Sequence, residues 1–355
     1  VYGDSWLHRH MDLLDVQLFA YGRPFLSDLG YPQSWASVGH WEGHWATHNT
    51  AWGIIPEIEP LQLKSDTPYY FLKALSGRGK LVRLMEGDGV QAVEVQAERW
   101  AWDMKQQRWM RPGVHLRRLV ALIETDNEGV ALVDFMRVRG GTQHWRTCRG
   151  LEGSLANQTG RWTQKTGTAA DQNIKRGETI NVSHPDLSAL AFMDQVYHYD
   201  GPDAWHGCWI SNHEPHTKLD IHQISATTGT QVMSARSTAT MGEPEDSNYK
   251  YHGLLWKRNP TREKQESHTD LVFEPRVNAN PKIATVSQIC GDSQTSGVNI
   301  KTCCDRSISI YWAPYETGTP SVFHDGTVLY DGIGIVVDGK AEAMAKCFQP
   351  PSKKV

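Results

Sequence analysis

The chain has 355 residues, with 36 Lys+Arg against 40 Asp+Glu and a formal net charge of −4. This length corresponds to about two domains of ordinary size, and the near-neutral charge argues against a general nucleic-acid binder, which usually shows a basic face. No apolar run comes near the ~18 residues of a transmembrane helix. The sequence therefore predicts a globular protein with no nucleic-acid partner and no membrane partner.

Strand signals dominate the chain from end to end. Two apolar runs flank a Tyr-Gly-Arg-Pro turn within residues 14–30, Gly-Asp-Gly separates two runs within 81–102, and Thr-Asp-Asn-Glu-Gly separates two more within 116–141. Each pattern is typical of an antiparallel hairpin. Strands at this spacing predict an all-β fold, a large antiparallel β-sandwich with a small C-terminal β unit. Later short runs between turn residues lie at 192–199, 206–211, 219–225, 230–237 and 269–275.

The remaining segments suggest how the chain is divided. Only residues 68–76 and 340–348 show a helical pattern, and both are short. A polar, Gly/Thr-rich stretch at 154–179 predicts a long exposed loop, and a second polar stretch at 257–268 precedes the last unit. We place a boundary near residue 276. The two predicted domains are a large sandwich at 1–275 and a small β domain at 276–355, which at ~80 residues favours packing against the sandwich.

The first fifty residues are rich in side chains that can bind a metal. If the His-Arg-His-Met-Asp sequence begins a strand, alternate side chains share one face, so His8, His10 and Asp12 point the same way. The next predicted strand ends at Asp28, and His48 follows within Thr-His-Asn-Thr. Two imidazoles and one carboxylate from separate elements form a plausible zinc-binding set with a fourth position open.

The same residues also have purely structural interpretations. An HxH pair is common on exposed strands, Asp28 can cap the turn before Gly30, and His48 can hydrogen-bond within its own loop. The Trp/His-rich stretch between them can simply pack on itself. Spacing alone does not decide between a metal site and these alternatives, because nothing in it specifies that the elements converge.

The pattern HxHxD, followed by a strand ending in D-x-G-Y and then by HNT, resembles the heparinase II/III-like polysaccharide lyases. The paired strands that carry Asp134, Arg137 and His144, and the later LLWKR and SHTDLVFEP segments, are similar to that family as well. The resemblance covers most of residues 1–275, whereas the last 80 residues match only as a C-terminal β unit. Arg9 and Thr47 depart from the Gly and Ala that are common in the family.

The resemblance implies β-elimination next to a uronic acid. By position, His8 corresponds to the catalytic histidine, and a neutral imidazole near its ordinary pKa of ~6.5 suits proton removal. His10, Asp28 and His48 correspond to the ligands of a Zn²⁺ ion, or of another divalent cation at the same site, and Asp12 to a carboxylate that orients one imidazole. Such a metal would hold loops in place and shape the cleft.

The resemblance further implies an N-terminal α/α toroid that supplies a catalytic tyrosine, and this sequence does not contain one. The chain begins without an initiator Met or a signal segment, so we expect a processed or truncated product, or one part of a larger enzyme, that is inactive without the toroid. The expected partners are an acidic polysaccharide and the toroid domain, and a homo-oligomer is left open. The usual setting of the family predicts a periplasmic or secreted bacterial protein.

Several side chains are candidates for substrate contact. The aromatic residues Tyr31, Trp41 and Trp45 can stack on sugar rings at the cleft rim or belong to the core. Arg137 and His144 can face the cleft or hydrogen-bond the neighbouring Gly-Gly turn. Both interpretations stay open for each residue.

Two other classes of function fit the same sequence. One is a non-catalytic carbohydrate-binding or structural β-sandwich that keeps the metal site for stability. The other is a metal-assisted glycan hydrolase, because two His and one Asp can also activate water. The products separate the classes, since β-elimination leaves a conjugated double bond, hydrolysis does not, and a binding module releases no product.

Overall fold

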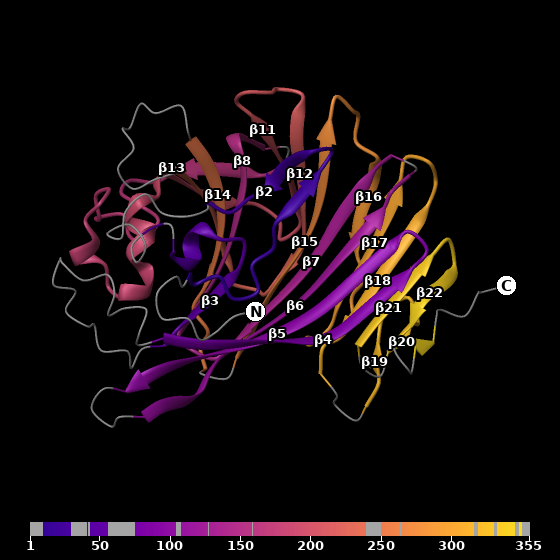
Figure 1. Ribbon diagram of the computed structural model, residues 1–355, viewed down its shortest axis with the longest axis horizontal. Helices are drawn as coiled ribbons and strands as arrows, with labels where there is room; N and C mark the ends of the chain where they lie inside the picture. The colour runs from indigo at the N-terminus through magenta and orange to yellow at the C-terminus, as the bar shows by residue number, and fades with distance from the viewer. Residues whose placement is uncertain are drawn as a thin grey trace.

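The computed structural model describes residues 10–29, 41, 43–55, 75–103, 108–126, 128–157, 159–238, 250–262, 265–315, 319–329, 332–344 and 348–349. The fold is all-β, as the sequence predicts. A large curved antiparallel sheet forms the body, and a smaller sheet packs at the end that carries the C-terminus (Figure 1). Within the described residues, no helix is long and apolar enough to cross a bilayer.

The large sheet has 13 strands in the order β4-β5-β6-β7-β15-β12-β11-β8-β14-β13-β10-β9, with β3 added against β8. Its strands are β3 (Ala51–Ile54), β4 (Leu75–Gly87), β5 (Val90–Asp103), β6 (Arg108–Glu124), β7 (Val130–Arg139), β8 (Gln143–Asn157), β9 (Arg161–Gln164), β10 (Asp194–Asp200), β11 (Trp205–Ser211), β12 (Thr217–Ala226), β13 (Gln231–Thr238), β14 (Lys250–Arg258) and β15 (Glu266–Val277).

The C-terminal part forms two small sheets, β16-β17-β18-β21-β22 and β19-β20-β23. Their strands are β16 (Ile283–Gln288), β17 (Ser296–Thr302), β18 (Ser307–Ala313), β19 (Ser321–Val322), β20 (Val328–Leu329), β21 (Gly332–Val337), β22 (Lys340–Met344) and β23 (Phe348–Gln349). One hydrophobic cluster joins Val133 and Phe135 of β7 to Ile310 and Ile335 of the five-stranded sheet. The division into two domains stays a prediction, since β15 runs past residue 275 and the sheets share this core.

β7 lies in the middle of the molecule, with other parts of the chain packed on both of its faces. All but its two end residues are buried, because both faces are covered. Val133 and Phe135 point towards the five-stranded sheet, whereas Leu132 and Met136 belong to the clusters on the opposite face. Side chains alternate along a strand, so Asp134 lies on the same face as Leu132 and Met136. The N-terminal segment packs on that face.

The three predicted hairpins are confirmed. β1 (Leu18–Ala20) pairs with β2 (Arg23–Leu26) through a two-residue turn in which Tyr21 has φ +53° and Gly22 has φ +72°. Positive φ at both central residues is what the twist of a tight hairpin requires. β4 pairs with β5 and β6 pairs with β7, both antiparallel.

Several local predictions are wrong. The N-terminal run is not a continuous strand, because a turn at Leu13-Leu14 interrupts it and Leu14 has φ +59°. The predicted helix at 340–348 is largely β22, since pairing with β21 outweighs its weak helical pattern. The helix at 68–76 falls outside the described residues except for its last two, which begin β4.

The two polar stretches are also more ordered than predicted. Residues 154–179 include the end of β8 and all of β9, which pairs with β10 at the sheet edge. The second stretch is a short link between β14 and β15, two strands of the same sheet. The polar sequence of these two stretches therefore belongs to strands at the sheet surface as well as to loops.

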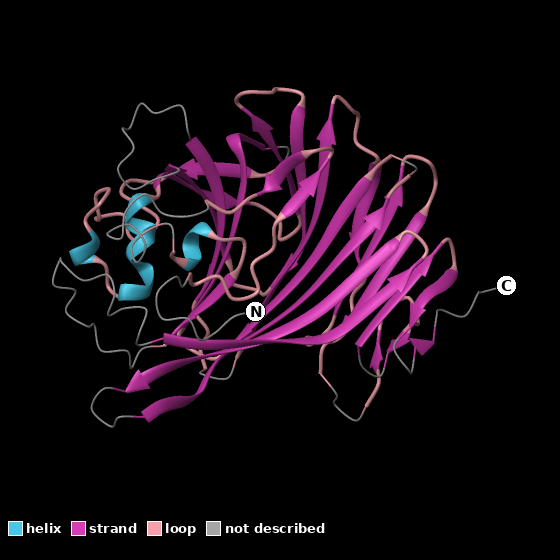
Figure 2. Cartoon of the chain, viewed as in Figure 1, coloured by secondary structure: helices cyan, strands magenta, loops and turns pink. Residues whose placement is uncertain are grey.

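Among the described residues, three short 3₁₀ helices accompany the strands: η1 (Trp45–Thr47), η2 (Thr179–Asn181) and η3 (Pro185–Phe192). They gather at the left of the view, at the end of the molecule opposite the C-terminal sheets (Figure 2). Asp186 of η3 accepts hydrogen bonds from three side chains in this region. Its Oδ2 accepts hydrogen bonds from Arg99 Nη2 (2.6 Å) and Trp52 Nε1 (3.0 Å), and its backbone oxygen accepts one from Trp45 Nε1 (2.6 Å).

Candidate metal centre

The structure brings together three residues that are far apart in the sequence. One ligand atom from each of His10, Asp28 and His48 lies within 4.8 Å of the other two. His48 Nδ1 is 2.8 Å from Asp28 Oδ2, and the two imidazole ring centroids are 5.3 Å apart. In the part of the chain that the structure describes, this is the one group of at least three such side chains with metal-binding spacing.

Each of the three residues belongs to a different local element. His10 precedes the turn at Leu13-Leu14, Asp28 follows β2, and His48 is the C-cap of η1. The β1–β2 hairpin reverses the chain between His10 and Asp28, which lets both reach the same point. Phe25 and Leu26 of β2 are fully buried in the core and anchor that hairpin.

His48, Asn49 and Thr50 each have a distinct structural role. The backbone oxygen of His48 accepts a hydrogen bond from Thr147 Oγ1 (2.7 Å), which fixes it against β8. Asn49 Oδ1 accepts a hydrogen bond from the backbone N–H of Arg149 (2.7 Å), also on β8. The Thr50 hydroxyl donates to the backbone oxygen of Leu13 and so joins this segment to the N-terminal turn. Thus the HNT sequence places one imidazole and holds two segments together.

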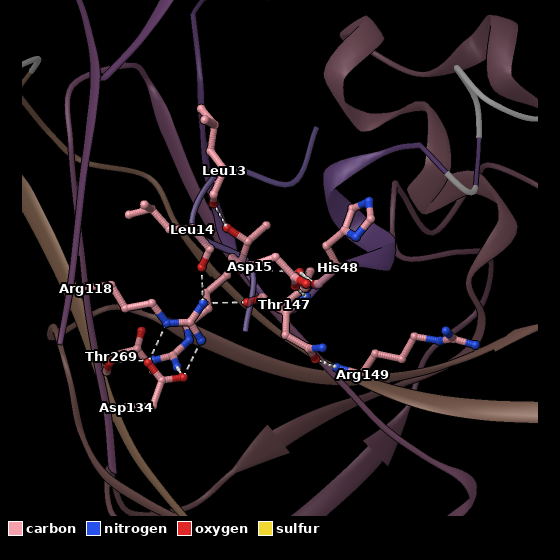
Figure 3. Close-up of polar contacts among 12 residues, drawn as sticks. Leu13, Leu14, Asp15, His48, Arg118, Asp134, Thr147, Arg149 and Thr269 are labelled. Atoms are coloured by element: carbon pink, nitrogen blue, oxygen red, sulfur yellow. Dashed lines mark hydrogen bonds and ion pairs between the residues drawn. The ribbon is translucent and has the colours of Figure 1, made fainter. Parts of the chain in front are cut away.

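A buried ionic network lies beneath these segments (Figure 3). Asp134 accepts hydrogen bonds from Arg118 Nε (2.8 Å) and Nη2 (2.5 Å), and also from Arg146 Nη2. The two flanking guanidinium groups lower the pKa of Asp134 although burial opposes them. Arg118 Nη1 also donates to the backbone oxygens of Leu14 (2.5 Å) and Asn49 (2.6 Å). The network therefore connects three strands of the large sheet to both segments that carry the imidazoles.

The donor set fits a zinc-like cation. His48 is fully buried, and its Nδ1 lies 2.8 Å from Asp28 Oδ2, the carboxylate that pairs with this imidazole. An imidazole nitrogen and a carboxylate oxygen that share a proton at this distance can bind one cation in its place. In a tetrahedral zinc site, bonds of ~2.0–2.2 Å place neighbouring ligand atoms ~3.4 Å apart, so the observed grouping needs only small side-chain shifts to hold an ion.

The electrostatics of the two imidazoles differ. Burial and the proximity of His48 lower the pKa of His10, which favours the neutral form that binds metals. Burial also acts to lower the pKa of His48, but Asp28 and Asp15 outweigh it and raise that pKa. An ion at this point would replace the proton that the carboxylates attract.

Asp15 is a member of this neighbourhood that sequence reasoning missed. Burial raises its pKa, and its Oδ1 accepts a hydrogen bond from the backbone N–H of Asn49 (2.6 Å). The sequence feature that could have indicated Asp15 is its position three residues after Asp12. In the structure the two residues form a turn, in which the backbone N–H of Asp15 donates to the backbone oxygen of Asp12 (2.9 Å). Asp12 itself is exposed, and within the described residues it acts on the imidazoles through its charge, without a hydrogen bond to either.

The residues predicted to contact the substrate are either buried or outside the described residues. His8 and Tyr31 lie outside the described residues. Trp41 and Trp45 have no exposed surface, so the prediction that they stack on sugar rings is wrong. Trp45 instead stacks on Trp52 with ring centroids 6.2 Å apart, in the core beneath η1.

Arg137 and His144 are likewise buried and committed to internal contacts. Arg137 pairs with Glu266 (2.8 Å) and donates to Ser296 Oγ (2.8 Å). The His144 ring contacts Ser267 Oγ (2.6 Å) and the backbone oxygen of Gly140 (2.9 Å), and burial lowers its pKa to about 4. Of the two interpretations left open for these residues, the structural one is correct, and their prediction as substrate contacts is wrong.

No protein-family model matches the chain, and no curated protein matches it either. Among solved structures, a crystal structure of heparinase III is 12% identical and has a TM-score of 0.43, with 84% of this chain and 35% of that chain covered. The heparan sulfate lyase from Pedobacter heparinus is 10% identical, with a TM-score of 0.39 and coverages of 96% and 37%. The chain therefore spans about a third of the length of these structures.

Proposed function

We propose that the chain is the metal-bearing β-sandwich part of a lyase that cleaves uronic-acid-containing polysaccharides by β-elimination. The observation that carries the proposal is the convergence of His10, Asp28 and His48 at one point. These residues belong to the HxHxD, D-x-G-Y and HNT sequences whose order resembles the heparinase II/III-like lyases. The convergence supports that resemblance, because an accidental motif match would not bring the three side chains together.

β-Elimination at a uronate has three requirements. The sugar carboxylate must be neutralised, the proton on the carbon alpha to it must pass to a base, and the glycosidic C–O bond must break as the new C=C bond forms. The leaving oxygen then takes a proton from an acid. In the proposal His8 is the base, because it corresponds by position to the catalytic histidine of the heparinase II/III-like lyases. The acid is a tyrosine of an α/α toroid domain, as the same resemblance implies.

The metal has a supporting role in this proposal. His10, Asp28 and His48 would hold it, and its double charge would fix the relative positions of the N-terminal segment, the β1–β2 hairpin and η1. Asp12 and Asp15 would add negative charge around the imidazoles. The proposed setting is the periplasm or the outside of a bacterial cell, where an acidic polysaccharide is accessible.

The test is a product assay on heparin-like, chondroitin-like and alginate-like glycans. The chain is joined to an α/α toroid and compared with the His8→Ala variant, with His216→Ala as a control because His216 is exposed. We expect ultraviolet absorbance from a conjugated, unsaturated uronate with the unchanged chain and with the control, and its loss in His8→Ala. Saturated products would instead indicate a hydrolase, and no product from any acidic glycan would contradict the lyase proposal.

A further inference from the structure

Arg149 of β8 differs from the other buried arginines of the large sheet. Its side chain is 3% exposed, yet none of its Nε, Nη1 and Nη2 atoms has a hydrogen-bond partner in the described structure. The four other described arginines that are at most 3% exposed each donate to a carboxylate: Arg99, Arg118, Arg137 and Arg146. Arg149 therefore has no paired carboxylate in the described fold, and Tyr251 is the polar side chain that contacts its guanidinium.

This guanidinium lies within electrostatic range of Asp28 in the candidate metal centre. The backbone N–H of Arg149 donates to the side chain of Asn49, the residue that follows His48. The charge of Asp28 acts on the guanidinium and favours its protonated form. In Figure 3 the His48 side chain points to the upper right and the Arg149 side chain runs to the right below it. A group bound by Arg149 would thus be a neighbour of the metal cluster.

One face of the guanidinium is already occupied. Its central carbon is 3.6 Å from the centroid of the Tyr251 ring, so the two planar groups stack. Stacking satisfies the flat face of the cation but leaves its edge, where all five donors point. Burial lowers the pKa of Arg149 to about 10, which still leaves it charged at neutral pH. A buried cation without an acceptor is unfavourable in the free protein.

We propose that Arg149 is the oxyanion-binding residue of a subsite beside the metal centre, and that its ligand is a carboxylate or sulfate group of an acidic sugar. The planar fork of a guanidinium matches two oxygens of either group, and the stacked Tyr251 ring holds the fork in one orientation. This inference rests on the proposed function, which supplies the acidic glycan, but it concerns a residue that the metal-binding pattern does not include.

The test measures the thermal unfolding midpoint in sodium glucuronate, sodium sulfate and sodium chloride of equal ionic strength. The Arg149→Met variant is expected to unfold at a higher temperature than the unchanged chain in chloride, because it removes an unpaired buried charge. The unchanged chain is expected to gain stability in at least one oxyanion salt relative to Arg149→Met. Arg149→Lys, which keeps the charge without the fork, should bind that anion about tenfold more weakly.

The matched control is Arg161→Met, since Arg161 is 78% exposed and its pair with Asp200 spans 3.5 Å. Arg161→Met should neither raise the unfolding midpoint in chloride nor change the response to the oxyanion salts. A response to glucuronate identifies a carboxylate ligand, and a response to sulfate identifies a sulfate ligand. If Arg149→Met lowers the midpoint in chloride and keeps the full anion response, Arg149 is a structural residue and the inference is overturned. Zinc content, measured on the same variant, shows separately whether the metal centre is intact.

Discussion

Asp134→Asn should destabilise the protein strongly, because Asp134 is the shared acceptor of the buried network. The carboxylate is fully buried and receives three charge-assisted hydrogen bonds from Arg118 and Arg146. An asparagine of the same shape keeps one acceptor but turns an NH₂ group towards a guanidinium and leaves two buried cations without a counter-charge. Removing one partner from a buried ion pair costs about 3–5 kcal/mol, and we expect a loss in that range.

The assay is urea unfolding followed by tryptophan fluorescence, which the 14 Trp residues make sensitive. The midpoint should fall by about 1 M or more for such a loss. The control is Asp200→Asn, the same chemical change in an ion pair whose side chains are 74% and 78% exposed. Exposed pairs contribute little, so the control midpoint should stay within the equivalent of ~0.5 kcal/mol.

Equal midpoints for the two variants would refute the reasoning. Such a result would mean that Arg118 and Arg146 find other acceptors, and that the network is not what holds the N-terminal segment on the sheet. Arg118 also donates to the backbones of Leu14 and Asn49, so Asp134→Asn should weaken metal retention along with stability.

Two further changes test other parts of the fold. Burial raises the pKa of Glu274 to about 7, so the folded state holds its proton more tightly than the unfolded state, and stability is lost as the pH rises from ~4.5 to ~7, by up to ~3 kcal/mol. Glu274→Gln, measured by urea unfolding at several pH values, should remove that loss while still accepting from Lys282 N–H and Ile283 N–H. Gly150→Ala should cost about 1–3 kcal/mol in the same assay, because an added Cβ would lie 2.1 Å from the Trp209 ring.

Each of these changes has an outcome that contradicts it. A constant stability difference between Glu274→Gln and the unchanged chain at pH 5 and pH 8 would mean that Glu274 titrates alike in both states. Gly253→Ala is the control for Gly150→Ala, since its Cβ would have no atom closer than 3.8 Å. Similar midpoints for both glycine variants would show that the Trp209 ring can move aside.

Sequence reasoning predicted the parts of the fold that local chemistry determines. The Tyr21-Gly22 turn fixes the first hairpin, because its twist needs positive φ at two residues. The same hairpin accounts for much of the metal cluster, since it returns the chain from His10 to Asp28. Residue types made His48 a candidate third ligand, and the motif resemblance favoured that role over a structural one.

The errors arise where tertiary contacts override the local pattern. Leu14 adopts a left-handed conformation inside an apparently regular strand sequence, and its backbone oxygen is held there by Arg118, more than a hundred residues away. Trp45 lies in a Trp/His-rich stretch for which the sequence left both a cleft rim and a core position open, and contacts with Trp52 and Asp186 place it in the core. Arg149 gives no sequence signal, because its lack of a partner is a property of the packed structure.

We propose that His10, Asp28 and His48 together bind one metal ion. The most direct measurement is elemental analysis of the purified chain beside His48→Ala, with the exposed His216→Ala as the control. The account predicts one equivalent of zinc, or of another divalent cation, in the unchanged chain and in the control, and its loss in His48→Ala. No bound metal in the unchanged chain after zinc is supplied, or full retention in His48→Ala, would contradict it.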